Sequence, residues 1–231
     1  MESKLPNDVL TLWDSYLTHK SKGLKKEAAD LLNKVICNIE ALDFTVIKNF
    51  AYYLTDLHRE EHLKIDFRLF EKLIYPVLVS EINLNALTSN RRLAQFDQFL
   101  LPSNPLFKNL KEQLNYESEY FEPADFYEKE ITLNQNDLIA VDGLLTRIAA
   151  NLNYATHELP EYGLLWHIEY FDEELKQFEQ FLLLSPEKDL WSERVEHWKF
   201  ALKTWTDYTS NQETYKNYKD YLDKNQLTFL M

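Results

Sequence analysis

Residues 136–152 have the sequence NDLIAVDGLLTRIAANL, in which apolar positions recur at the three- and four-residue spacing of an amphipathic helix. Asn136 or Asp137 supplies a side-chain oxygen of the kind that caps a helix N-terminus. The apolar stripe consists of Leu138, Val141, Leu144, Leu145, Ile148 and Leu152. A stripe of this length must be buried against other elements. The stretch therefore predicts a core helix.

The same helical spacing extends along most of the remaining chain. Asp43 can cap one of these helices, and Pro76 is expected to kink or end another. Ser185 followed by Pro186 is typical of a helix start nearer the C-terminus. We expect helices at residues 7–22, 28–39, 44–54, 67–74, 91–101, 105 onward, 138–152, 169–184, 186–205 and 215–222. The sequence thus predicts an all-α protein of about nine or ten helices.

Three tryptophans recur every seven residues in the helix expected after Pro186. They are Trp191, Trp198 and Trp205. Rings at this spacing share one stripe of a helix, so the stripe is buried in the core or against a partner. Of these two interpretations we favour the core.

Glycine is scarce, with only Gly23, Gly143 and Gly163 in 231 residues. Tight hairpins and phosphate-binding loops need glycine for positive φ angles or close backbone approach. Three scattered glycines cannot form a dinucleotide-binding loop, a P-loop or a nucleophile elbow. Nucleotide-binding α/β folds and serine hydrolases are therefore disfavoured.

The charge balance is strongly acidic, with 38 acidic against 25 basic residues and a net charge of −13. A nucleic-acid binder draws most of its affinity from cations that neutralise phosphates, so we expect no nucleic-acid partner. Such acidity is typical of a soluble protein, or of one that is steered electrostatically to a basic partner.

A reducing compartment is expected from the use of cysteine. Cys37 is the only cysteine, and its apolar neighbours predict a buried, inert thiol. The N-terminal sequence MESKLPNDVL lacks the apolar core of a signal peptide, and runs such as LIYPVLV at 73–79 are too short to cross a bilayer. We expect a cytoplasmic protein without a membrane partner.

Two segments resemble each other in the same register, RRLAQFDQFLL at 91–101 and EELKQFEQFLL at 173–183. Such similarity is found in repeats of helical hairpins, although amphipathic helices also resemble one another by their nature. We expect antiparallel hairpins arranged as an irregular α-solenoid or as a two-lobed bundle. The lobes would be residues 1–101 and 136–231, joined by a linking segment at 102–135, unless the whole chain forms one continuous domain.

The pattern Trp13-x-x-Tyr16, Gly23 and Glu27-Ala28 resembles the first helix and turn of a tetratricopeptide repeat. The stretch ITLNQNDLIAVDGLL at 131–145 is similar to a junction between such repeats, although most repeat positions for glycine or alanine hold bulky residues here. The layout, with ATHELP at 155–160 before a long helix, is also similar to uncharacterised bacterial helical proteins, some of which serve as immunity proteins beside secreted toxins. The resemblance implies a helical array that binds other proteins, and it transfers no catalytic residue.

One motif has the spacing of a metal site. His58, Glu61 and His62 fit the pattern H-x-x-E-H, in which two histidines one turn apart bind zinc and the glutamate acts as a general base. Glu128 or Glu130 would be distant candidates for a third ligand. The same spacing of residues also arises by chance at the charge-rich end of a surface helix, and we favour that interpretation. We expect no cofactor.

An acidic segment rich in aromatic residues occupies 116–130, YESEYFEPADFYEKE. Rings within a field of carboxylates are what a binder of a basic protein presents. The alternative is a linker whose rings pack onto the core and whose acids are solvated. The candidate contacts are Tyr116, Glu117, Glu119, Tyr120, Glu122, Asp125 and Tyr127.

The sequence taken together predicts a protein that binds another protein without catalysis, through a helical surface and the acidic aromatic segment. One alternative is an immunity-type inhibitor that neutralises a basic toxin such as a nuclease. Another is a zinc-dependent hydrolase that uses His58, Glu61 and His62. A third is a purely structural or oligomeric role.

Overall fold

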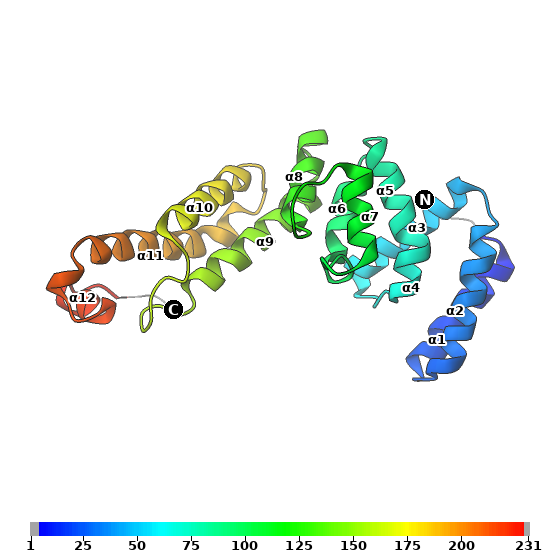
Figure 1. The fold of residues 1–231 in the computed structure, drawn as a ribbon, viewed down its shortest axis with the longest axis horizontal. Coiled ribbons are helices and arrows are strands. Elements are labelled where there is room, and N and C mark those ends of the chain that lie inside the picture. The colour runs from blue at the N-terminus through cyan, green and yellow to red at the C-terminus, as the bar shows by residue number, and fades with distance from the viewer. Residues whose placement is uncertain (1–4, 229–231) are drawn as a thin grey trace. The chain divides into compact units, whose positions relative to one another are not determined.

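The computed structural model describes residues 5–228 of the chain. Helix accounts for 73% of the protein, and the part described contains no strand. When α4, the π-helical turn after it and α5 are counted as one continuous helix, the described residues hold eleven α-helices, close to the nine or ten predicted (Figure 1). The all-α prediction is confirmed.

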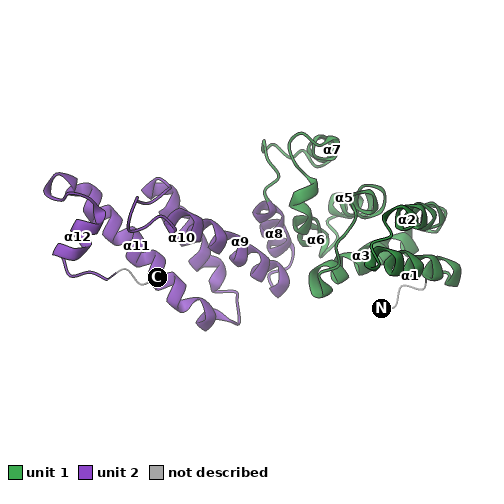
Figure 2. Cartoon of the chain, turned by 90° about the horizontal axis from the view of Figure 1, so that it is seen from below, with its two compact units in different colours: residues 1–122 green, residues 123–231 purple. Residues whose placement is uncertain are grey.

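The chain divides into two compact units, residues 1–122 and 123–231, which Figure 2 shows in different colours. The predicted linking segment 102–135 contains two helices, one in each unit. Unit 1 contains α1 Asn7–Ser21, α2 Lys25–Glu40, α3 Phe44–Glu61, α4 Phe67–Leu69, α5 Tyr75–Asn83, α6 Ser89–Leu93 and α7 Pro105–Leu114. Unit 2 contains α8 Pro123–Leu133, α9 Leu138–Thr156, α10 Ile168–Leu182, α11 Ser192–Ser210 and α12 Tyr218–Lys224.

Helices α1 and α2 pack as a hairpin whose connecting turn contains Gly23, at φ +73°. On α1, the buried Trp13 meets the ring of Phe50 from α3 edge-on, with centroids 5.4 Å apart. Cys37 is exposed, contrary to the prediction of a buried thiol. At 100° per residue it lies on the side of α2 opposite the buried stripe of Leu32, Val35 and Ile39.

Pro76 does not end its helix. A π-helical turn, Phe70–Ile74, joins α4 to α5, and Pro76 lies in the first turn of α5. Proline has no N–H to donate to the preceding turn of a helix. In a π-helical turn each N–H faces a carbonyl one residue further back than in an α-helix. This change in hydrogen bonding before Pro76 allows the helix to continue past it. Phe70 stays fully buried within the turn.

The segment 91–101 is helical over only part of the predicted length. Helix α6 ends at Leu93, and a 3-10 turn Ala94–Phe99 follows, in which Phe96 has non-helical angles of φ −118° and ψ 31°. The matching segment 173–183 lies almost entirely in α10. Similar sequence therefore gives different local structure at these two places.

A buried arginine joins α6 to α3 within unit 1. Arg92 is 6% exposed and donates hydrogen bonds to both carboxylate oxygens of Asp56, at 2.8 and 3.1 Å. Its guanidinium lies 4.4 Å from the ring centroid of Tyr52. The planar group thus pairs with a carboxylate and stacks on an aromatic ring, which lysine could not reproduce.

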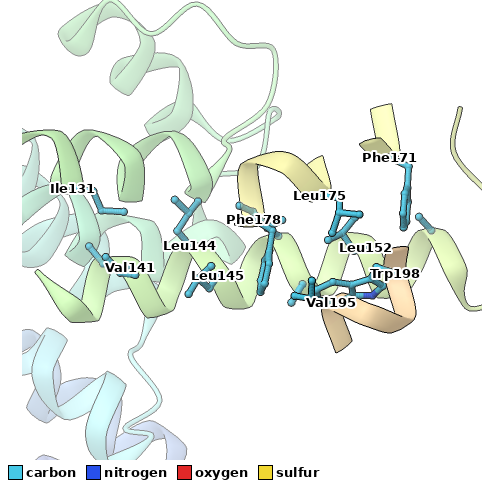
Figure 3. Packing of buried hydrophobic residues seen from close by; sticks show 14 residues of the cluster. Ile131, Val141, Leu144, Leu145, Leu152, Phe171, Leu175, Phe178, Val195 and Trp198 are labelled. Atoms are coloured by element: carbon cyan, nitrogen blue, oxygen red, sulfur yellow. The ribbon is translucent and has the colours of Figure 1, made fainter. Parts of the chain in front are cut away.

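The core of unit 2 is built around α9, as its apolar stripe predicts. Asp137 caps the helix by accepting a hydrogen bond from the N–H of Ala140 at 3.1 Å. Leu144, Leu145 and Leu152 pack in one buried cluster with side chains of α8, α10 and α11 (Figure 3). The cluster comprises Ile131, Ala140, Val141, Leu144, Leu145, Ile148, Ala149, Leu152, Ala155, Phe171, Leu175, Phe178, Val195 and Trp198.

The three tryptophans pack toward the interior of unit 2, two of them from α11 and Trp191 from the 3-10 turn before it. Trp198 is fully buried and donates its indole N–H to Asn153 of α9 at 3.1 Å. Trp191 packs against the same core cluster, and Trp205 packs against a second cluster with Tyr208 and Tyr218. The helix itself begins at Ser192, later than predicted, because a 3-10 turn Lys188–Trp191 follows the Ser185–Pro186 start.

None of the helices in residues 5–228 combines the length and the apolar content needed to span a membrane.

We expect Gly163→Ala to lower the free energy of unfolding by about 2–3 kcal/mol. Gly163 has φ +128°, and an added Cβ would lie 2.6 Å from the ring of Trp205. Gly23→Ala is the matched control, because Gly23 has φ +73° but open space around it, and we expect a cost of only about 1 kcal/mol. Urea unfolding followed by circular dichroism measures both, and equal costs would show that the contact with Trp205 contributes nothing.

Candidate functional site

An open cavity of about 610 Å³ lies on unit 2, where the loop after α9 leads into α10. Carboxylate, amide and aromatic side chains share its walls. The lining residues are Leu165, Trp166, His167, Tyr170, Glu173, Glu174 and Gln177. We call this cavity the acidic groove.

The amphipathic pattern of α10 places four of these residues on one face. Phe171, Leu175 and Phe178 are buried in the core cluster and fix the orientation of the helix. Positions three and four apart lie on the same side of a helix. The stripe that lines the acidic groove consists of Tyr170, Glu173, Glu174 and Gln177.

Hydrogen bonds hold two of these side chains in place. Gln177 donates from its side-chain amide to Glu128 of α8 at 2.5 Å, and Asn151 of α9 donates to Glu174 at 2.8 Å. The acidic groove therefore adjoins α8, and the carboxylate of Glu174 is positioned by α9. A preset arrangement of this kind loses little conformational entropy when a partner binds.

Negative charge is concentrated beside the acidic groove. Burial raises the pKa of Glu128, and the neighbouring carboxylates of Asp125 and Glu174 raise it further. The hydrogen bond from Gln177 acts in the opposite direction. Glu128 is thus repelled by the carboxylates of Asp125 and Glu174, and a cation close to Glu128 would relieve this repulsion.

Aromatic and apolar surface is exposed next to these carboxylates. Tyr170 is 64% exposed and Leu165 43% exposed. The rings of His167 and Tyr170 meet edge-on with centroids 6.0 Å apart, and Trp166 packs against the core cluster beneath. An aromatic face beside carboxylates suits the ammonium or guanidinium group of a basic side chain.

The predicted contacts of the 116–130 segment have different environments. Tyr116 is buried, packs its ring against Phe107 at 6.2 Å, and accepts a hydrogen bond from the N–H of Glu122 at 3.1 Å. It is not available as a surface anchor. Phe121 and Phe126 are buried as well, so the alternative of rings packed onto the core describes these three aromatics.

The other predicted contacts are more accessible. Glu117, Glu119, Tyr120 and Glu122 are exposed on unit 1 after α7, with Tyr120 at 59%. Asp125 and Tyr127 are half-buried on α8 of unit 2. An added Cβ at Gly143 of α9 would lie 2.6 Å from the ring of Tyr127, so that ring is packed closely on the helix.

Sequence reasoning missed Tyr170, Glu173, Glu174 and Gln177 as binding residues. Their spacing in the stretch 169–184 was a usable signal, because an aromatic and three polar residues recur at three- and four-residue steps on the face that flanks the apolar stripe. No sequence signal paired Glu128 with Gln177, since these residues meet only when α8 and α10 pack on α9.

The H-x-x-E-H residues do not assemble as metal ligands. Helix α3 ends at Glu61, and His62 follows it in a left-handed conformation with φ 55°. The Nδ1 atom of His58 forms a hydrogen bond with the carbonyl of Leu63 at 2.7 Å, and its ring stacks on Phe96. Within residues 5–228, no three His, Cys, Asp or Glu side chains gather closely enough to hold a metal ion.

Protein-family models, curated proteins and solved structures give no match to this chain.

We expect Glu128→Gln to increase the free energy of unfolding at pH 7 by a few tenths of a kcal/mol, a value discounted for solvent screening. Because the pKa of Glu128 is raised in the folded state, ionisation of this carboxyl destabilises the fold. This penalty is present at neutral pH and disappears as the pH falls below the ordinary glutamate pKa. The substituted amide can still accept the hydrogen bond from Gln177.

Urea unfolding at pH 7 and pH 4 tests this expectation. The gain should be present at pH 7 and clearly smaller at pH 4, where the carboxyl is mostly protonated in both the folded and the unfolded chain. Glu187→Gln, at an exposed glutamate outside the acidic groove, serves as the control. A loss of stability at pH 7 would mean that favourable contacts of the carboxylate outweigh its burial and repulsion.

Proposed function

We propose that this protein binds a basic segment of another protein in the acidic groove, without catalysing a reaction. The observation that carries the proposal is that Glu173 and Glu174 line the acidic groove together with the exposed ring of Tyr170. The hydrogen bond from Gln177 brings the carboxylate of Glu128 next to this lining. Carboxylates attract and orient a lysine or arginine side chain, and the ring supplies contact area and a cation–π partner. The net charge of −13 steers such a partner from a distance.

The exposed residues Glu117, Glu119, Tyr120 and Glu122 of unit 1 offer a second acidic surface with an aromatic ring. We propose that these four residues also contact the basic partner. An immunity-type inhibitor of a basic toxin such as a nuclease is one protein that would use surfaces of this kind. The overall acidity favours it, because charge complementarity accelerates association with a basic enzyme.

A fluorescein-labelled peptide of alternating lysine and leucine is a suitable probe for anisotropy titrations. We expect saturable binding that weakens as salt is added, because exposed charges are screened. Combining Glu128→Gln with Glu174→Gln should weaken binding about tenfold, since each lost charge pair is worth roughly 0.5–1 kcal/mol. Tyr170→Ala should weaken it about threefold through the lost ring contact.

The matched control combines Glu187→Gln with Glu213→Gln, which removes the same charge from two exposed positions outside the acidic groove. Equal weakening by the two double variants would reduce the effect to net charge and overturn the proposed groove. A further double variant, Glu119→Lys with Glu122→Lys, tests the surface on unit 1. Unchanged affinity in that variant would exclude this surface from the contact.

A further inference from the structure

A second cavity, of about 570 Å³, lies within unit 1 between the α1–α2 hairpin and the start of α4. Its size falls within the range of small-molecule sites, which is about 300–1,000 Å³. Its lining includes Gly23, Ala28 and Ala29, whose small size leaves room beside the turn. We call it the cationic pocket.

Positive charge predominates on the walls of this pocket, contrary to the charge of the chain as a whole. Lys20, Lys25 and Arg68 line it, against the single carboxylate of Asp66. That carboxylate is already engaged, because it caps α4 by accepting a hydrogen bond from the N–H of Arg68 at 3.0 Å. The lining therefore has a surplus of positive charge in a protein of net charge −13.

Lys20 is the most enclosed of the three cations. Its ammonium donates to the hydroxyl of Tyr16 at 2.9 Å and to the carbonyl of Lys64 at 2.5 Å. Both acceptors are neutral. Burial lowers the pKa of Lys20 even though Asp66 acts to raise it, so the available carboxylate does not fully compensate this charge.

The remaining walls are apolar. Leu32 is buried at the base of the pocket, and Phe67 is 40% exposed at its side. An added Cβ at Gly23 would meet nothing within 4 Å, so the turn leaves open space there. A ligand that fits this combination needs an anionic group for the lysines and Arg68, and an apolar or aromatic body for Leu32 and Phe67.

We propose that the cationic pocket binds a small organic anion, a carboxylate carried on an apolar or aromatic body. The carboxylate lies among Lys20, Lys25 and Arg68, and the body lies against Phe67. This site is independent of the proposed protein binding, since it belongs to the other unit and selects the opposite charge.

The probe that tests the proposal is 4-(trifluoromethyl)benzoate, followed by fluorine NMR. We expect saturable binding, with perturbed methyl signals of Ala28 and Ala29 in protein labelled with carbon-13 at its alanine methyls. The neutral 4-(trifluoromethyl)benzamide should bind at least about fivefold more weakly, because it lacks the charge that the lysines and Arg68 recognise. Lys25→Gln and Arg68→Gln should each weaken benzoate binding about threefold to fivefold.

Lys26→Gln is the matched control, because it removes the same charge from the next exposed residue of α2 without altering the lining. We expect its affinity for benzoate to remain within about twofold of the original. Circular dichroism verifies that each variant is folded. Equal binding of benzamide and benzoate, methyl shifts confined to alanines outside the pocket, or equal weakening by Lys26→Gln would overturn the proposal. Displacement of benzoate by inorganic phosphate at equal concentration would also overturn it, since phosphate lacks the apolar body.

Discussion

Burial of the apolar stripe of α9 is the interaction on which unit 2 depends. Leu144, Leu145 and Leu152 occupy one face of a helix that begins at the Asp137 cap, and α8, α10 and α11 cover that face. Removal of this apolar surface from water drives the packing. It also fixes which face of α10 remains outside. Phe171 and Phe178 of α10 are buried in the core. Tyr170 and Gln177 on the same helix line the acidic groove instead.

Charge is distributed unevenly over this chain, although its net value is strongly negative. Around the acidic groove, Glu128 and Glu174 are held by neutral amides from Gln177 and Asn151. In the cationic pocket, Lys20 is held by a phenol and a carbonyl. At both places uncharged groups orient a charged side chain without neutralising it. The charge of that side chain can therefore attract a ligand of opposite charge. Arg92 with Asp56 shows the opposite case, in which a buried guanidinium is neutralised by a partly exposed carboxylate.

The sequence predicted features that depend on local periodicity and capping. The all-α class, the capped start of α9 and the inward stripe of tryptophans follow from apolar spacing, and the structure confirms them. Features that depend on tertiary packing were missed or misjudged. The sequence did not predict the π-helical turn that precedes Pro76, and of the two alternatives at this residue, a kink or an end, only the end is excluded. Tyr116 is buried beside Phe107, although it was expected at the surface. Glu128 of α8 and Gln177 of α10 form a direct hydrogen bond only because both helices pack on α9. No spacing in the sequence predicts this contact.

The exposed position of Cys37 has a practical consequence. It is the one thiol in the whole chain, so a maleimide dye or nitroxide would attach at a single place, on the solvent side of α2. That helix also contributes Ala28 and Leu32 to the cationic pocket, while the acidic groove belongs to the other unit. A spectroscopic reporter can thus be installed on the helix that contributes to one cavity, without any further mutation and without altering the side chains that line either cavity.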